Sequence, residues 1–312
     1  MVYYFRLQTE AGNEDSTDEG VYESKAIFLR GSAKGVAVLA GVAAWKPDLQ
    51  ATPYGKPVGL QLYTLRNELA QDLAGTLRKV AEIGYKEVEI FDFYGKNSAE
   101  MRKLLRDHGL NAPSAHYQGV QIRSSWEKQI EYAKAVGLKY MVNAIIWPPE
   151  RKSLDDYKQL ADLFNKAGDQ CQKAGIQFAY HNHNFEFKAY DGVVAYDELL
   201  KRTDPALVQF EMDCFWVTRA GQDPVAYFEK YPGRFPLLHI KDLNKGFSPT
   251  VDDNFKPGPF APVGQGTIDW KGSFAAAPKG GLKHFFVEQD ECDKPPLESI
   301  KISFDYLKNL KV

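Results

Sequence analysis

The chain of 312 residues carries 39 Lys and Arg residues against 41 Asp and Glu residues, a formal charge of −2, and 44% of its residues are hydrophobic. These values leave room for one large core, and the absence of a long run of one charge argues against a polyanionic partner. Three cysteines at wide spacing, without a CxxC pair, indicate neither a disulfide framework nor a thiolate zinc site. We therefore expect one globular domain with an extension, and no nucleic-acid binding.

The N-terminal extension, residues 1–56, is predicted to lie outside the folded domain. Residues 1–23 are polar and acidic and have no sustained hydrophobic period. A signal-peptide pattern follows, in which three basic residues precede an apolar run of small residues, 35–44. The pattern resembles a twin-arginine export signal in which a Lys-Ala pair stands in the place of the two arginines.

The apolar run predicts export rather than membrane anchoring. About ten residues are too few to span a bilayer as a helix, which takes roughly 20, so we expect no stable membrane insertion. Export would place the protein in the periplasm, whereas the alternative, a buried amphipathic helix capping the domain, would leave it in the cytoplasm. The sequence from Pro47 to Lys56 is typical of a linker, which favours export.

Residues 57–312 are predicted to form one (β/α)8 TIM barrel of the α/β class. Their number, 256, is close to the ~250 typical of that fold. Short β-branched or aromatic runs alternate with helical periodicity, as in consecutive βα units. Eight strands are predicted, at 59–63, 87–91, 112–116, 140–143, 177–180, 208–212, 236–240 and 284–288. Helices are predicted between them, at 69–83, 98–108, 126–136, 154–174 and 196–201.

Glycines lie at the ends of several predicted helices. Gly84, Gly109, Gly137 and Gly175 each follow a predicted helix and precede a strand, at the position where helices commonly end in the left-handed region. A doubly wound nucleotide-binding sheet is the alternative fold, but no GxGxxG motif follows a predicted strand. The segment 244–270, rich in Pro, Gly and Asp, is predicted to be a long loop on the rim of the active site.

Polar side chains follow four consecutive predicted strands, the fifth to the eighth. They are His181 and His183, then Asp213, then His239, and then Glu288. Because the active sites of TIM barrels lie at the carboxyl ends of the strands, these side chains are expected to meet at one rim. Imidazole and oxygen ligands without thiolate suit Mn, Co, Zn, Mg or Fe(II). A structural role is the alternative for each residue, and Asp213 could simply cap the following helix.

Six segments resemble the sugar phosphate isomerase/epimerase family of xylose isomerase-like TIM barrels, which includes ketose 3-epimerases, inosose dehydratases and endonuclease IV. The resemblance covers residues 57–312. It implies one Mn-type ion held by Glu, Asp, His and Glu at the ends of strands five to eight, where Asp213, His239 and Glu288 match type for type. The segments are GLQLYTLR (59–66), YHNHNFEF (180–187), FEMDCFW (210–216), LHIKD (238–242), PVGQGTIDW (262–270) and FVEQDE (286–291).

The strand-five position departs from the family pattern, and this bears on the mechanism. Ketose epimerases carry Glu there, whereas this chain places His181 in the ligand position, with His183 as the alternative on the same side of the strand. The epimerases use two carboxylates, one on each face of the substrate, to remove and return a proton. Here Glu288 is the one such carboxylate, so we expect it to accept the proton, with His183 or Glu186 as donor or shuttle.

The leading expectation is a metal-dependent isomerase or epimerase of a monosaccharide or keto-sugar, with proton transfer through an enediolate. A lyase or hydratase acting on a keto-sugar of the 3-keto-glycoside or inosose type is the alternative within the same fold. A non-catalytic sugar-binding barrel is the alternative of another class, and the retained Asp213, His239 and Glu288 argue against it. Six histidines and a net charge of −2 argue against an endonuclease.

Further side chains near the predicted strand ends are candidate contacts for a small sugar substrate. For Lys241, an ion pair with Asp242 is the alternative, and for Trp216 a core-filling role. Dimerisation is common in the family that the chain resembles, so a homodimer is a further expectation. The candidate contacts are Gln61, Glu89, His116, Lys241 and Trp216, the last with its neighbour Phe215.

Overall fold

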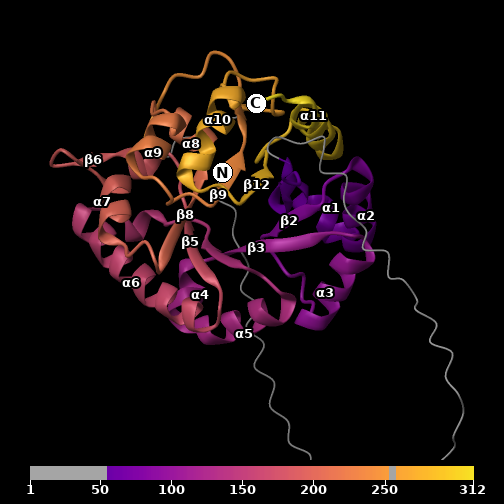
Figure 1. Ribbon diagram of the computed structural model, residues 1–312, viewed down its shortest axis with the longest axis horizontal. Coiled ribbons are helices and arrows are strands. Elements are labelled where there is room, and N and C mark those ends of the chain that lie inside the picture. Colours follow the sequence, from indigo (N-terminus) through magenta and orange to yellow (C-terminus); the bar gives the residue numbers. More distant parts are fainter. Residues whose placement is uncertain (1–54, 253–257) are drawn as a thin grey trace, which may run out of the picture. The chain divides into compact units, whose positions relative to one another are not determined.

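The computed structural model describes residues 55–252 and 258–312, and its centre is a closed barrel of eight parallel strands (Figure 1). Each barrel strand pairs with the next one along the chain, and the last closes the barrel on the first. The predicted (β/α)8 fold is confirmed, and every predicted strand is found within two residues at each end. The strands are β1 (Gly59–Gln61), β2 (Glu87–Ile90), β3 (Asn111–Tyr117), β4 (Tyr140–Asn143), β5 (Gln177–His181), β8 (Val208–Asp213), β9 (Leu237–Ile240) and β12 (His284–Val287).

Helices surround the barrel, as Figure 1 shows. The helix predicted at 69–83 is divided into α1 (Arg66–Gln71) and α2 (Leu73–Ile83), because Asp72 accepts a hydrogen bond from the Gly75 amide at 2.8 Å and caps the second helix. The other predicted helices are found as α3 (Ser98–Asp107), α5 (Trp126–Val136), α6 (Leu154–Lys173) and α7 (Ala195–Arg202). Five more lie outside the predicted ranges: α4 (Gly119–Ser124), α8 (Cys214–Arg219), α9 (Pro224–Lys230), α10 (Trp270–Gly280) and α11 (Pro296–Asn309).

The four glycines predicted to stop helices all have positive φ, with values of 125° at Gly84, 66° at Gly109, 102° at Gly137 and 78° at Gly175. Residues with a Cβ rarely adopt this conformation. At Gly84 a Cβ would also lie 2.4 Å from the ring of Phe304 on α11. The glycine there meets a backbone requirement and a packing requirement together.

Strand β9 shows how the barrel sorts side chains between its two faces. Leu238 and Ile240 belong to the main core between strands and helices, whereas Leu237 joins a separate apolar cluster with Val142, Ala179 and Phe286. Side chains alternate along a strand, so His239 shares the inward face with Leu237. The barrel interior is therefore apolar at one level and carries ionisable groups at the next.

The predicted long loop at 244–270 contains regular structure of its own. Strand β10 (Asp242–Leu243) pairs antiparallel with β11 (Phe260–Ala261), and α10 starts at Trp270. The carboxylate of Asp242 accepts hydrogen bonds from the Gly264 and Gly266 amides, at 2.8 and 3.1 Å. The second half of this loop is thus folded around one buried side chain. A smaller pair, β6 (Ala189–Tyr190) and β7 (Val193–Val194), follows β5.

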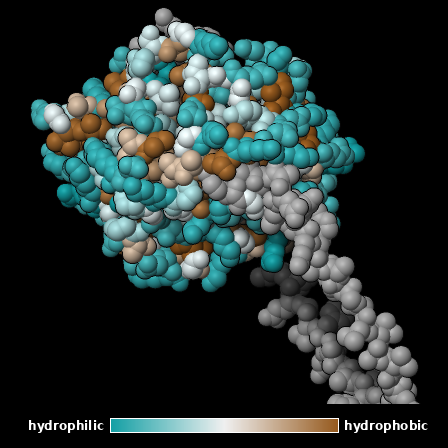
Figure 2. Space-filling view, turned by 45° about the horizontal axis from the view of Figure 1, so that its top comes forward, coloured by the Kyte–Doolittle hydropathy of each residue, from teal (hydrophilic) through white to brown (hydrophobic). Residues whose placement is uncertain are grey.

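The predicted export segment and its linker lie outside the described residues. Within the described ranges, no helix combines the length and the apolar character needed to cross a membrane. Figure 2 shows a face on which hydrophobic residues are scattered in small groups among hydrophilic ones. That face gives no support to the predicted homodimer, which stays a prediction.

Candidate metal centre

Four of the predicted side chains meet at the carboxyl end of the barrel. His181, Asp213, His239 and Glu288, here called the outer cluster, each offer one ligand atom, and these atoms lie within 4.8 Å of one another. They come from β5, β8 and β9 and from the residue after β12, which are neighbours in the barrel. His181 Nε2 lies 3.2 Å from Asp213 Oδ2, and His239 Nδ1 lies 2.8 Å from Glu288 Oε2. The structure thus places these four predicted residues side by side, and their role as metal ligands stays a prediction.

Asp213 fills both roles that the sequence left open. Its Oδ1 accepts a hydrogen bond from the Trp216 amide at 3.0 Å and caps α8, while Oδ2 faces His181 and His239. Its backbone amide donates to the side-chain oxygen of Asn182 at 3.1 Å, which ties β8 to the loop after β5. One carboxylate oxygen is thus fixed by the helix, and the other is directed into the cluster.

His181 rather than His183 contributes to the outer cluster. His181 Nδ1 lies 3.0 Å from the carbonyl oxygen of Ala144, and this contact directs Nε2 toward Asp213. Burial, together with the nearby charge of His239, lowers the pKa of His181 to about 4. A neutral imidazole that donates through Nδ1 keeps a lone pair on Nε2, which is the form that binds a metal.

Lys241 lies against the outer cluster. Its ammonium nitrogen is 2.6 Å from Glu288 Oε2, 3.1 Å from Asp213 Oδ2 and 3.0 Å from Asp290 Oδ1. The predicted alternative pairing with Asp242 is wrong, because Asp242 is enclosed by amides of the following loop. Burial alone would raise the pKa of Glu288, but Lys241 and His239 hold it well below its usual range. Glu288 is therefore a firmly ionised carboxylate.

His183 lies beside the outer cluster. Its ring stacks on Phe185 at 5.2 Å and lies 5.4 Å from the ring of Trp216. Burial and the nearby His181 lower the pKa of His183 well below its ordinary value. Its Nδ1 is buried and has no hydrogen-bond partner among the described residues. The lowered pKa favours the neutral ring, which is the form that can accept a proton, but it also makes the ring a weak base. Proton transfer to His183 therefore requires a negative charge on the bound substrate or nearby, as Glu288 supplies in part.

Glu186, predicted to donate or shuttle a proton, is bonded through both oxygens. Oε1 accepts a hydrogen bond from the Tyr180 hydroxyl, and Oε2 accepts one from the His183 amide at 2.9 Å. The side chain is fully buried, and burial raises its pKa to about 7. This geometry gives Glu186 a positioning role for His183, and its part in proton transfer stays a prediction.

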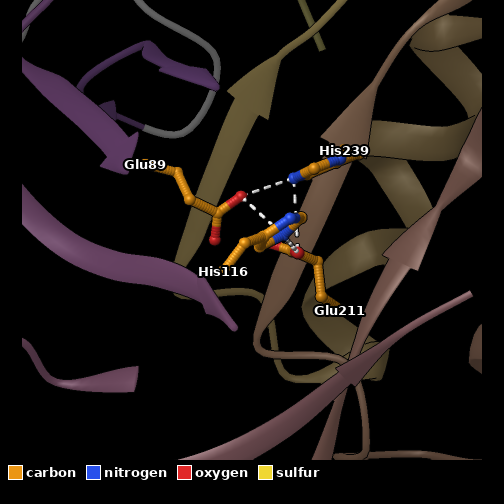
Figure 3. Close-up of side chains that lie close together, drawn as sticks. All are labelled: Glu89, His116, Glu211 and His239. Carbon is orange, nitrogen blue, oxygen red and sulfur yellow. Dashed lines mark hydrogen bonds and ion pairs between the residues drawn. The ribbon is translucent and has the colours of Figure 1, made fainter. Parts of the chain in front are cut away.

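A second group of ligand-type side chains lies deeper in the barrel (Figure 3). Glu89, His116, Glu211 and His239, here called the inner cluster, converge from β2, β3, β8 and β9, again with ligand atoms within 4.8 Å of one another. Glu89 also accepts hydrogen bonds from Gln61 Nε2 at 2.7 Å and from the Ser114 hydroxyl. Three predicted substrate contacts, Gln61, Glu89 and His116, thus belong to one buried network.

Charges within the inner cluster perturb one another. Burial and the neighbouring Glu89 raise the pKa of Glu211 to about 7. Burial alone would lower the pKa of His116, but Glu89 and Glu211 raise it to about 9. Glu211 was not predicted to have a role, although it precedes Asp213 by two residues and therefore shares its face of β8. This two-residue spacing is the feature of the sequence from which a role for Glu211 could have been predicted.

Trp216 and Phe215 pack beneath the long loop after β9. Trp216 is 2% exposed, its ring lies 5.8 Å from Phe260, and Phe215 stacks on Phe260 at 4.7 Å. Lys241 Nζ lies 5.6 Å from the centre of the Trp216 ring. Trp216 therefore fills a core and at the same time borders the outer cluster, and its contact with substrate stays a prediction.

The outer cluster fits a divalent cation by its donor set. Two imidazole nitrogens and two carboxylate oxygens form a set typical of Zn, Mn, Co or Fe(II) sites. His239 Nδ1 is buried and lies 2.8 Å from the Glu288 carboxylate. Fold and site together define a TIM barrel with a metal-type centre at the carboxyl ends of its strands, where barrels of this kind carry their active sites.

Comparison with known proteins agrees with this class. The sequence profile of the Xylose isomerase-like TIM barrel family matches residues 77–310, so the chain belongs to that family. It is similar to an inosose dehydratase of Geobacillus kaustophilus, with 25% identity over 75% of this chain and 86% of the relative. A crystal structure of a sugar phosphate isomerase/epimerase from Parabacteroides distasonis has 30% identity, a TM-score of 0.68, and coverage of 83% of this chain and 98% of that one. The chain is thus an enzyme of this barrel family, and the proteins it is similar to include both a dehydratase and an isomerase/epimerase.

The structure of the IOLI protein, which contains a bound zinc atom, shares the fold at 15% identity and a TM-score of 0.65, with coverage of 80% of this chain and 96% of that one. At this identity the likeness shows the fold alone. The case for a divalent metal in this chain therefore depends on its own residues in the outer cluster.

Proposed function

We propose that this enzyme is a metal-assisted dehydratase of a small keto-polyol, a cyclic keto-sugar or inosose. The observation that carries the proposal is the asymmetry of the site. One neutral imidazole with an unpaired nitrogen, that of His183, lies beside the outer cluster, while Glu288 is held ionised by Lys241 and His239. One proton acceptor and a nearby cation suit elimination better than the symmetrical exchange of a proton between two carboxylates.

The proposed reaction balances without a co-reactant. A C–H bond next to the substrate carbonyl breaks, and its proton passes to His183 Nδ1, whereas the sequence led us to expect Glu288 as the acceptor. The electron pair forms a carbon–carbon double bond, and the hydroxyl on the next carbon leaves. The same proton completes the departing water molecule. The products are an unsaturated ketone and water.

The chain's own residues supply the remaining requirements of this reaction. His181, Asp213, His239 and Glu288 would hold a divalent ion, whose contribution is to polarise the carbonyl as a Lewis acid. The Lys241 ammonium, paired with Asp290, places a positive charge next to the bound oxygens. Glu186 keeps the loop carrying His183 in place through the amide of that residue.

The similarity to inosose dehydratases supports the same reaction class. The second candidate is isomerisation or epimerisation, which the sequence favoured. It is supported by the similarity to the sugar phosphate isomerase/epimerase from Parabacteroides distasonis. The two reactions differ in product mass, since dehydration removes one water and isomerisation removes nothing. Product analysis therefore separates them directly.

The test is to incubate the purified, metal-loaded protein with keto-inositols and 3-keto-sugars and to analyse products by mass spectrometry and NMR. We expect loss of water in the wild type, loss of turnover with unchanged metal content in His183→Gln, and wild-type turnover in His108→Gln, which alters a histidine at the end of α3. An isomeric product would favour the second candidate. A metal-loaded protein that converts none of these substrates, or a His183→Gln variant with full activity, would overturn the proposal.

A further inference from the structure

The inner cluster has the geometry of a metal site in its own right. His239 Nε2 lies 2.6 Å from Glu89 Oε2 and 3.3 Å from Glu211 Oε2. His116 Nε2 lies 2.8 Å from Glu211 Oε2 and 3.1 Å from Glu89 Oε2. Figure 3 shows these four side chains pointing toward one point from different strands. Two imidazole nitrogens and two carboxylate oxygens therefore surround one position inside the barrel.

These distances are close to those in a tetrahedral site. With metal–ligand bonds of about 2.1 Å, neighbouring ligand atoms of a tetrahedron lie about 3.4 Å apart. The four nitrogen–oxygen separations run from 2.6 to 3.3 Å, so an ion would require His239 and Glu89 to move apart by about 0.8 Å and the other pairs by less.

The Glu211 carboxylate gives a second, independent observation. The side chain is fully buried, and its Oε1 has no hydrogen-bond partner within the described ranges. Both oxygens of Glu89, in contrast, accept hydrogen bonds: Oε1 from the Ser114 hydroxyl, and Oε2, the oxygen that faces the imidazoles, from Gln61 Nε2. An unpaired carboxylate oxygen in an apolar interior is costly, and a cation next to it removes that cost.

The balance of buried charges also favours a second divalent ion. With their carboxyl groups ionised, as metal ligands are, Asp213 and Glu288 bring two negative charges to the outer cluster, and Glu89 and Glu211 bring two more to the inner one, all of them buried. One divalent ion would neutralise one pair and leave the other to the imidazoles. Two divalent ions would neutralise all four carboxylates, while the nearby Lys241 is balanced by Asp290.

We propose that the inner cluster is a second divalent-cation site, so that the protein holds two ions with His239 between them. Glu89, His116 and Glu211 are the ligands that belong to the inner site alone, and three protein ligands are enough for a zinc-type site. His239 presents Nε2 to this site and Nδ1 to the outer one. It would bind both ions only as the imidazolate, after releasing its ring protons to water, and otherwise Glu89, His116 and Glu211 hold the inner ion without it. The proposal concerns metal content and does not depend on the dehydratase reaction.

The experiment compares the metal content of matched variants by plasma mass spectrometry and by calorimetric titration with Mn²⁺, Co²⁺ and Zn²⁺ after chelator treatment. We expect two ions per chain in the wild type, and one each in Glu211→Gln and Asp213→Asn, which alter the inner and outer sites on the same strand. Glu87→Gln is the control, because Glu87 pairs with His284 near the opposite end of the barrel. It should retain two ions. In the Mn²⁺-loaded wild type, electron paramagnetic resonance should show coupled ions, and this coupling should be absent from both single-site variants.

The outcomes separate the two sites. A wild type that saturates at one ion, or a Glu211→Gln variant that retains the wild-type count, overturns the second site and leaves an imidazolium–carboxylate network in its place. A count that falls in Glu211→Gln but not in Asp213→Asn would instead contradict the outer site on which the proposed function rests. If Glu211→Gln fails to fold by circular dichroism, His116→Gln replaces it, and the wild-type count still decides.

Discussion

Asp242 is the side chain whose substitution we expect to loosen the loop beside the active site. Its Oδ2 accepts hydrogen bonds from the amides of Gly264 and Gly266 and from Trp270 Nε1, at 2.8, 3.1 and 3.0 Å. Its Oδ1 accepts from the amides of Leu243 and Ile268, at 2.9 and 3.1 Å. The side chain is 1% exposed, so water cannot replace these contacts. Five donors from one loop thus depend on a single carboxylate.

The change Asp242→Asn keeps the size of the side chain and removes one of its two acceptor oxygens. Whichever way the amide turns, at least two N–H donors lose their acceptor and face an NH2 group. An unsatisfied buried donor costs about 1–3 kcal/mol, so we expect a loss of about 4 kcal/mol in the free energy of unfolding. For a domain of this size that corresponds to a fall of about 8–16 °C in Tm, at about 2–4 °C per kcal/mol.

The assay is thermal unfolding by calorimetry, with Asp269→Asn as the matched control. Asp269 is exposed and accepts one hydrogen bond, from the Gly272 amide at 3.0 Å, as the N-cap of α10. Asn caps helices about as well as Asp, so the control should lose less than about 1 kcal/mol. A Tm for Asp242→Asn within about 2 °C of the wild type would refute the view that this carboxylate holds the loop.

Three further predictions follow from buried groups. Removal of metal by a chelator should lower Tm, and readdition at about 100 times Kd should restore about 2.7 kcal/mol; a Tm indifferent to chelator would contradict the metal sites. Burial raises the folded-state pKa of Glu186 to about 7, so its contribution to stability is full below the unfolded pKa and is lost as pH rises through about 7. Urea unfolding measures this loss. Between pH 5 and pH 8 the free energy of unfolding of Glu186→Gln should rise by up to about 3 kcal/mol relative to that of the wild type. If the difference in unfolding free energy between the two proteins is the same at both pH values, the raised pKa is wrong. Phe178→Ala removes a ring packed against Trp126 and Phe164 and should cost about 3–5 kcal/mol in the same assay, with intact metal binding.

Much of the outer cluster could be predicted from the sequence because a closed parallel barrel leaves little freedom at its strand ends. Once β5, β8, β9 and β12 are placed, the residues that end them must lie on one rim, in the order of the strands. The choice between His181 and His183 needed the structure, since both lie on the same side of the strand. The contact of His181 with the Ala144 carbonyl decides it, and that contact joins the end of β5 to the residue after β4, which is 37 positions earlier in the sequence.

Other features could not be predicted because they depend on rotamers and loop paths. Lys241 and Asp242 are adjacent in sequence, so an ion pair between them was a natural expectation, but successive side chains of an extended chain point in opposite directions. Lys241 accordingly faces the barrel axis and Asp242 faces the loop. The division between α1 and α2 depends on a single cap, Asp72, inside a continuous helical pattern.

His239 lies between the two clusters because of its position on the inward face of β9. On β9, inward residues alternate with outward ones, so the interior passes from Leu237 in the apolar layer to His239 between the two clusters and then to Lys241 at the outer one. On β8 the same spacing sends Glu211 to the inner cluster and Asp213 to the outer one. The two nitrogens of the His239 imidazole face different clusters. A charge bound in one cluster therefore changes the basicity of the nitrogen that faces the other cluster. The two clusters are therefore coupled through His239, and the ion content of one should influence the affinity of the other.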